Sequence, residues 1–152
     1  MVETTEMPST KRRRSMMMIQ RLVGARTEML SLYNLLAKQK PFNDLAETQM
    51  LLQEFCQSLV DYTANAHFQL YRYFAENNER RKEIRDVAVN IYPRVLDITN
   101  AILDFNDKYD FGDHSIQVKS LEDDLSILGE MLADRIELED QLIIAFGYDL
   151  EN

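Results

Sequence analysis

The sequence contains no tryptophan, one cysteine, two histidines, four glycines and three prolines in 152 residues. The single Cys56 excludes an internal disulfide, and few glycines and prolines leave little room for the turns of a fold built from short strands. The chain also lacks an uncharged apolar run approaching the ~18 residues of a membrane span, and its N-terminus lacks the apolar core of a signal peptide. We therefore expect a soluble helical protein of a reducing cytoplasm.

Charge is distributed unevenly along the chain, whose formal net charge is −9. Residues 1–21 carry five basic and two acidic side chains, net +3, whereas residues 110–152 carry two basic and twelve acidic ones, net −10. Affinity for nucleic acid comes from clustered Lys and Arg, so the acidic balance argues against sequence-specific DNA binding and favours a basic protein partner. The alternative is that the charge serves solubility alone.

Apolar residues recur every three or four positions over four long segments, which is the spacing of one helix face. We expect helices over residues 15–39, from Asn43 or Asp44 to the Asn77-Asn78 pair, from about Ile84 to Tyr109, and from Ser115 or Val118 to Phe146. The inward stripe of the second helix is predicted to be Leu51, Phe55, Leu59, Tyr62, Ala66, Leu70 and Tyr73. Four such helices pack most simply as an antiparallel up-down-up-down four-helix bundle, an all-α fold.

The breaks between these segments predict three regions. They are a disordered basic arm over residues 1–14, one helical-bundle domain over residues 15–148 and an acidic tail over residues 149–152. Ser15 is the predicted N-cap of the first helix, and Gly147 is the predicted end of the last. We expect Pro93 to kink or split the third helix, because proline removes a backbone donor, and we expect a bend near residues 64–66 in the second.

Three charged residues interrupt the predicted inward stripes. Arg26 falls between apolar positions of the first helix, and Arg135 and Glu139 continue the stripe of the fourth. Because an unpaired buried charge is costly, we expect these three side chains to form a buried or half-buried network. The alternative places them at the rim of the bundle, with buried stems and solvated head groups.

The opposite face of the second helix is polar with one aromatic exception. Its members, spaced by three or four residues, are Glu54, Gln57, Ser58, Asp61, Asn65, Phe68 and Arg72. An aromatic residue on a polar face is either an exposed contact residue or is covered by another segment. On spacing alone, an ordinary solvated face is the simpler interpretation.

No pattern in the sequence indicates catalysis or metal binding. No Glu is followed three residues later by His, so the di-iron pattern of helical bundles is excluded, and HExxH, P-loop and GxGxxG motifs are missing. Cys56 lies beside Phe55 on the predicted inner side, which favours a structural thiol over a nucleophile. We predict a protein that is not an enzyme and needs no metal or cofactor.

The stretch Phe55-Cys56-Gln57-Ser58-Leu59-Val60-Asp61-Tyr62, followed by His67-Phe68, resembles the signature of the Rsd/AlgQ family of bacterial regulators. Similar collinear stretches lie between residues 19 and 144, among them Ile91-Tyr92-Pro93 and residues 133–143. The chain departs from the family pattern at Tyr92, where relatives carry tryptophan, and at Ala66, where they carry glycine. The basic run over residues 11–14 has no counterpart in the pattern.

This resemblance implies an anti-sigma factor that binds the C-terminal, −35-recognition domain of the primary sigma factor and withholds it from RNA polymerase in stationary phase. It implies contact through the helix that carries the signature. The implied contact residues are Asp61 first, with Glu54, Gln57, Ser58, Asn65, Phe68 and Arg72 around it. The alternative is an Rsd-like interaction module with another client, such as a stress-response or phosphotransfer protein. Homodimerisation through an apolar face stays open.

Overall fold

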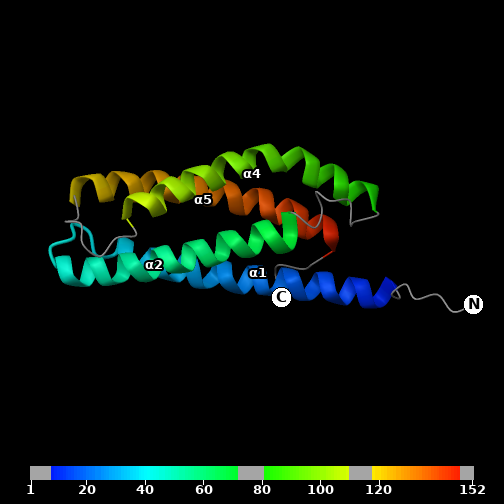
Figure 1. The fold of residues 1–152 in the computed structure, drawn as a ribbon, viewed down its shortest axis with the longest axis horizontal. Coiled ribbons are helices and arrows are strands. Elements are labelled where there is room, and N and C mark those ends of the chain that lie inside the picture. The colour runs from blue at the N-terminus through cyan, green and yellow to red at the C-terminus, as the bar shows by residue number, and fades with distance from the viewer. Residues whose placement is uncertain (1–7, 72–80, 110–117, 148–152) are drawn as a thin grey trace, which may run out of the picture.

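The computed structural model describes residues 8–71, 81–109 and 118–147. These residues form four α-helices and no strand: α1 (Pro8–Ala37), α2 (Leu45–Asn65), α4 (Lys82–Tyr109) and α5 (Val118–Phe146), with a π-helical turn η1 (Ala66–Tyr71) directly after α2. The helices run alternately up and down the long axis of the molecule (Figure 1). The predicted all-α four-helix bundle is confirmed.

Helix α1 begins seven residues before the predicted start. Pro8 occupies its first position, where the missing backbone N–H of proline costs nothing and its fixed φ suits a helix. Lys and Arg are good helix formers, so the basic run continues the helix. The expectation of a disordered arm is therefore wrong for residues 8–14, and Ser15 is a buried residue inside α1 instead of its N-cap. Residues 1–7 and the predicted tail over 149–152 lie outside the described residues.

Helix α2 starts as the sequence predicts. The Asp44 side chain accepts a hydrogen bond from the backbone N–H of Glu47 at 3.0 Å, which satisfies one of the unpaired donors of the first turn. The inward stripe follows the prediction as far as Ala66, and the α-helical pattern then gives way to the π-helical turn. In that turn Tyr71 is buried. The side chains predicted inward at 70 and 73 lie outside the described residues.

Helix α4 buries all eight residues of its predicted stripe: Ile84, Ala88, Ile91, Val95, Ile98, Ile102, Phe105 and Tyr109. Pro93 is exposed and α4 continues through it, so the expected split does not occur, although the helix is bowed (Figure 1). Gly147 follows α5 with a φ of 100°, a conformation that glycine adopts at helix C-termini, as predicted.

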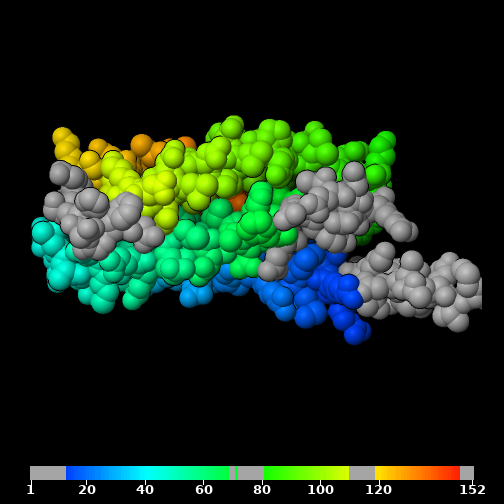
Figure 2. All heavy atoms as spheres, in the orientation of Figure 1, coloured from blue at the N-terminus to red at the C-terminus, as the bar shows by residue number. Residues whose placement is uncertain are grey.

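The helices pack as two close hairpins that meet along α2 and α4. Helix α1 packs closely on α2, α4 on α5, and α2 on α4. Between α1 and α5 long side chains reach across, as when the Tyr33 hydroxyl donates to the carbonyl of Leu125 at 2.7 Å. In the view of Figure 2, α2 and α4 form the visible face, with α1 along its edge.

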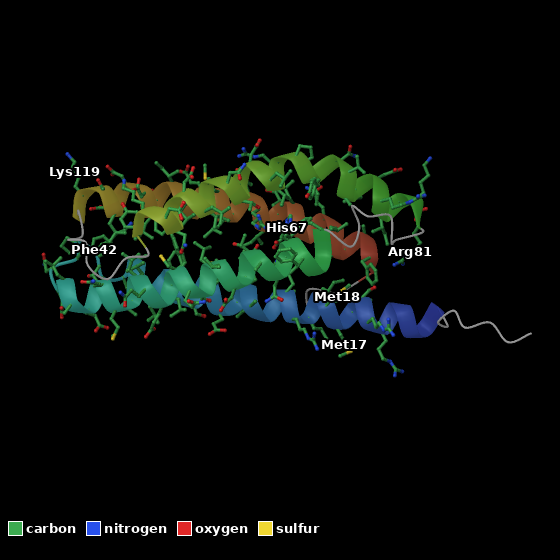
Figure 3. The ribbon with its side chains drawn as sticks, viewed as in Figure 1. Met17, Met18, Phe42, His67, Arg81 and Lys119 are labelled. Carbon is green, nitrogen blue, oxygen red and sulfur yellow. The ribbon has the colours of Figure 1, made fainter. Side chains whose placement is uncertain are left out.

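Figure 3 shows which residues lie at each end of the bundle. Phe42, buried in the turn between α1 and α2, and Lys119 lie at one end, and Arg81 lies near the other. Met17 and Met18 lie on the N-terminal part of α1, where Met17 is 46% exposed. Among the described helices, none has a window apolar enough for the interior of a bilayer.

Candidate functional site

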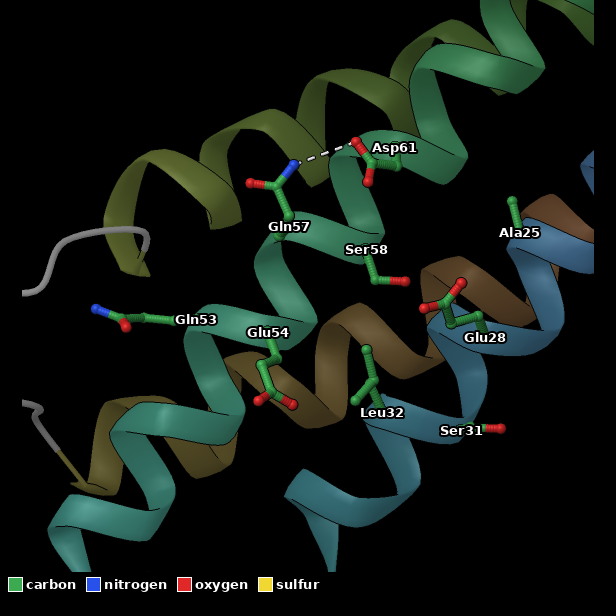
Figure 4. Close-up of a pocket in the computed structure, with 9 residues that line it drawn as sticks. All are labelled: Ala25, Glu28, Ser31, Leu32, Gln53, Glu54, Gln57, Ser58 and Asp61. Atoms are coloured by element: carbon green, nitrogen blue, oxygen red, sulfur yellow. Dashed lines mark hydrogen bonds between the residues drawn. The ribbon is translucent and has the colours of Figure 1, made fainter.

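A surface groove runs between the C-terminal half of α1 and the middle of α2 (Figure 4). Its volume is about 580 Å³. From α2 it is lined by Gln53, Glu54, Gln57, Ser58 and Asp61, and from α1 by Ala25, Glu28, Ser31 and Leu32. The groove therefore contains four of the seven residues that the sequence places on the polar face of α2.

The groove is acidic. Glu28, Glu54 and Asp61 contribute three exposed carboxylates, and none of the nine described residues that line it is basic. The Asp61 carboxylate accepts a hydrogen bond from the Gln57 side chain at 3.2 Å, which orients it along the helix. The Glu28 carboxylate points from α1 toward Ser58 (Figure 4). Such a cleft attracts cationic groups and selects for partners that carry Lys or Arg.

The other predicted contact residues lie farther along the same chain segment. Asn65 is half-buried at the end of α2 and does not line the groove. Phe68 lies in the π-helical turn with 58% of its surface exposed, and the ring of His67 packs against it at 5.0 Å between centroids. Arg72 lies outside the described residues. The structure therefore gathers four predicted residues in the groove and leaves Phe68 on the turn beyond it.

Sequence reasoning missed the contribution of α1 to this groove. Ala25, Glu28 and Leu32 follow one another by three and four residues, a spacing that places them on a single flank of α1 beside its buried stripe. That spacing is readable in the sequence. The packing of the helices decides which neighbouring helix this flank faces, and the sequence pattern of α1 does not indicate that packing.

The three charged stripe residues lie inside the bundle. Arg135 and Glu139 are 0% exposed and Arg26 is 9% exposed. The Glu139 carboxylate lies 3.5 Å from the Arg26 guanidinium and 3.4 Å from that of Arg135. Arg26 also binds Asp140 at 2.8 Å at the edge of α5. The charges thus compensate one another between α1 and α5, as buried charges must.

Polar partners from α2 and α4 extend the network, although Nε and Nη2 of Arg135 and Oε2 of Glu139 are buried without a hydrogen-bond partner. The Tyr62 hydroxyl donates to Glu139 at 2.6 Å, and the Arg135 guanidinium donates to the Thr99 hydroxyl at 2.6 Å and more weakly to the Val95 carbonyl at 3.4 Å. Burial raises the pKa of the Glu139 carboxyl, although the neighbouring arginine charges and the Tyr62 hydrogen bond act to lower it. Burial and the adjacent Glu139 charge raise the pKa of Tyr62 well above its ordinary value.

The residue types that support catalysis or metal binding do not converge in the described part of the chain. No three His, Cys, Asp or Glu side chains there are close enough to share a metal ion. Cys56 is fully buried on the inner side of α2, where attack on a substrate from solvent is blocked. The arrangement offers a shaped, negatively charged surface on a rigid pair of helices.

The sequence of the chain is similar to those of one family of regulators. The family model described as regulator of RNA polymerase sigma(70) subunit, Rsd/AlgQ, matches residues 1–146. A "Regulator of sigma D" of Yersinia enterocolitica is 33% identical over 110 residues, which cover 70% of this chain and 62% of that protein. Another, of Salmonella paratyphi A, is 31% identical over 134 residues, which cover 84% of this chain and 80% of that protein.

No solved structure matches the chain. The match to the Yersinia protein spans less than two thirds of that protein's length, whereas the family model covers the described helices from α1 to α5. The family predicted from the signature around Asp61 is thereby confirmed. The chain belongs to the Rsd/AlgQ family of regulators of the sigma(70) subunit of RNA polymerase.

Proposed function

We propose that this protein is an anti-sigma factor that binds the C-terminal domain of the bacterial primary sigma factor through the acidic groove between α1 and α2. The observation that carries the proposal is the position of Asp61. This carboxylate belongs to the family signature and shares the groove with Glu28 and Glu54, without a basic residue among the described lining residues. A domain that reads the −35 promoter element must present basic side chains to DNA phosphates. Those side chains are complementary to the groove.

Occupation of this basic surface explains how binding regulates transcription. A sigma domain covered by the bundle cannot present the same side chains to promoter DNA, so the protein acts by competition in the cytoplasm and not by chemistry. The groove is formed by two regular helices that pack closely on each other. Its side chains are therefore positioned before the partner arrives, which lowers the entropy cost of association.

Titration calorimetry of the full chain with the isolated C-terminal sigma domain tests this proposal. We expect one-to-one binding that weakens as salt rises, because screening acts on exposed charges. Asp61→Arg should weaken binding by at least about tenfold, since it places a cation against a basic partner. The control is Asp97→Arg, which makes the same charge change at an exposed position on α4.

Two outcomes would count against the proposal. Equal binding by Asp61→Arg and the unmodified chain would refute the groove as the contact surface. No binding at high micromolar concentrations would refute the sigma domain as the partner and favour a different client of the same bundle, such as a stress-response or phosphotransfer protein.

A further inference from the structure

The π-helical turn changes which residues of the second helix face the interior. In an α-helix the residue four positions after Ala66, which is Leu70, would return to the inner face. In a π-helical turn the hydrogen bond spans five residues, so the inner position passes to Tyr71. Tyr71 is indeed 1% exposed. The α-helical period predicts Leu70 at an inward position, and the structure, with its π-helical turn, buries Tyr71.

Arg135 of α5 contacts Tyr71, the residue that the π-helical turn places inside. Its guanidinium carbon lies 5.5 Å from the ring centre of Tyr62 and 5.6 Å from that of Tyr71. Tyr71 follows Tyr62 by nine positions, which at ~100° per residue would place the two side chains on opposite sides of an uninterrupted α-helix. Both rings can face one guanidinium only because the π-helical turn lies between them. The Tyr71 contact, and with it simultaneous contact of Arg135 with both rings, is therefore specific to the π-helical register.

The guanidinium that makes these contacts is also held by polar side chains of α4 and of α5 itself. It donates to the Thr99 hydroxyl of α4 at 2.6 Å and lies 3.4 Å from Glu139, one turn farther along α5. The Tyr71 ring also packs near Tyr92 of α4, 6.4 Å between ring centres. Arg135 consequently presents a buried cation to the turn, and the π-helical register brings the Tyr71 ring to it.

The same turn carries the exposed aromatic residue of the candidate surface. Phe68 lies inside residues 66–71 and is 58% exposed, seven residues after Asp61. In an uninterrupted α-helix these two residues would project within ~20° of each other. A π-helical turn rotates the residues within it relative to those before it, so the direction of Phe68 relative to Asp61 depends on the register.

We propose that Arg135 is a positioning residue for the partner-binding surface: by contacting Tyr62 and Tyr71 together it selects the π-helical register of residues 66–71 and so sets the direction of Phe68. This inference rests on the proposed function for its effect on sigma binding. Its structural part, the choice of register by Arg135, stands independently of any partner.

The test compares Tyr71→Ala, which removes the ring, with Tyr71→Phe, which retains the ring and its contact with Arg135. Backbone NMR of the full chain identifies the register directly, because couplings across hydrogen bonds show whether the backbone N–H groups at the end of the turn, up to Tyr71, bond to the fifth or the fourth residue before them. We expect Tyr71→Ala to shift to α-helical bonding with Leu70 inward, and Tyr71→Phe to keep the π-helical pattern. Calorimetry should show about tenfold weaker sigma binding for Tyr71→Ala and near-normal binding for Tyr71→Phe.

A second variant protects the test against a folding failure of Tyr71→Ala. The double variant Arg135→Met with Glu139→Gln removes the cation and its buried counter-charge together, so that neither is left unpaired. It should also lose the π-helical pattern. The matched control is Arg94→Met, which removes an arginine from an exposed ion pair between α4 and α5 and should leave the register intact.

The outcomes separate the two proposals. A π-helical pattern that persists in Tyr71→Ala or in the double variant overturns the role of Arg135. A lost pattern with unchanged sigma affinity overturns the link between register and binding surface. If the unmodified chain does not bind sigma, the proposed function fails alone, because the NMR comparison does not involve sigma and still decides whether Arg135 selects the register.

Discussion

The hydroxyl of Tyr33 in α1 occupies the space that a side chain at Gly129 in α5 would fill. This close approach lets the hydroxyl reach past the helix surface to the backbone carbonyl of Leu125, to which it donates at 2.7 Å. Because α1 and α5 are joined largely through long side chains, this contact and the Arg26–Asp140 ion pair connect the first helix with the last. Position 129 thus accommodates only glycine while the Tyr33 hydroxyl occupies this space.

We expect Gly129→Ala to destabilise the fold by about 1–3 kcal/mol, the range for overpacking a filled site. Replacing an exposed glycine inside a helix by alanine normally stabilises the fold, since alanine is the better helix former. Gly24 in α1 provides that comparison, because a methyl group there meets nothing within 4 Å. Gly24→Ala should therefore stabilise the protein by about 1 kcal/mol.

Urea unfolding of both variants measures these free energies. Adding Tyr33→Phe to Gly129→Ala removes the clashing oxygen and should restore part of the lost stability. Stabilisation of the protein by Gly129→Ala would show that α5 and α1 separate without cost at this point.

Glu139→Ala should be the most destabilising of the substitutions considered. It leaves the Arg135 guanidinium fully buried without its nearby carboxylate and removes the acceptor of the Tyr62 hydroxyl. Breaking a buried ion pair from one side costs about 3–5 kcal/mol. The control is Asp134→Ala, which breaks an ion pair with Arg94 whose side chains are 53% and 56% exposed, and which should cost about 1 kcal/mol or less. Thermal or urea unfolding distinguishes the two, and equal stability of both variants would contradict the structural role of the network.

The pH dependence of stability should contain a contribution from Asp124. Burial alone would raise the pKa of this carboxyl, but hydrogen bonds from Lys108 and Tyr109 and the Lys108 charge lower it below the ordinary value of 3.8. A carboxyl with a lowered pKa in the folded state adds stability above its ordinary pKa and loses it as pH falls through the folded value. The free energy of unfolding of the unmodified protein should therefore exceed that of Asp124→Asn near neutral pH, and the difference should shrink below about pH 4.

Urea unfolding at a series of pH values measures this difference. Asp97→Asn serves as the control, since it removes an exposed carboxylate from α4. A difference between the unmodified protein and Asp124→Asn that stays constant down to pH 2 would contradict the assigned interaction.

The core of α4 illustrates what the sequence predicts well. Its inward residues recur with the period of an α-helix, so all eight were identifiable from spacing alone. The N-cap at Asp44 follows from local chemistry in the same way. The start of α1 is not predicted correctly, because a polar and basic run indicates disorder by its composition although Lys and Arg favour helices.

The π-helical turn and the groove illustrate what the sequence does not predict. Leu70 satisfies the α-helical period, so the pattern gives no reason to place Tyr71 inside; that choice depends on Arg135, which is distant in sequence. Glu28 was missed because its relation to Asp61 exists only once α1 and α2 are packed together. Periodicity describes each helix separately, whereas the site is formed between helices.

Glu28 therefore provides a test of the groove that the signature alone would not suggest. Glu28→Lys places a cation in the groove that Asp61 also lines, without changing the helix that carries the signature, and we expect it to weaken sigma binding by about tenfold. Glu122→Lys changes the net charge of the protein by the same amount at an exposed position on α5 and should alter binding by less than about twofold. Calorimetry at moderate salt compares them. If both variants lose the same affinity, the attraction is a property of the whole acidic protein; if only Glu28→Lys does, the partner's basic side chains enter the groove between α1 and α2.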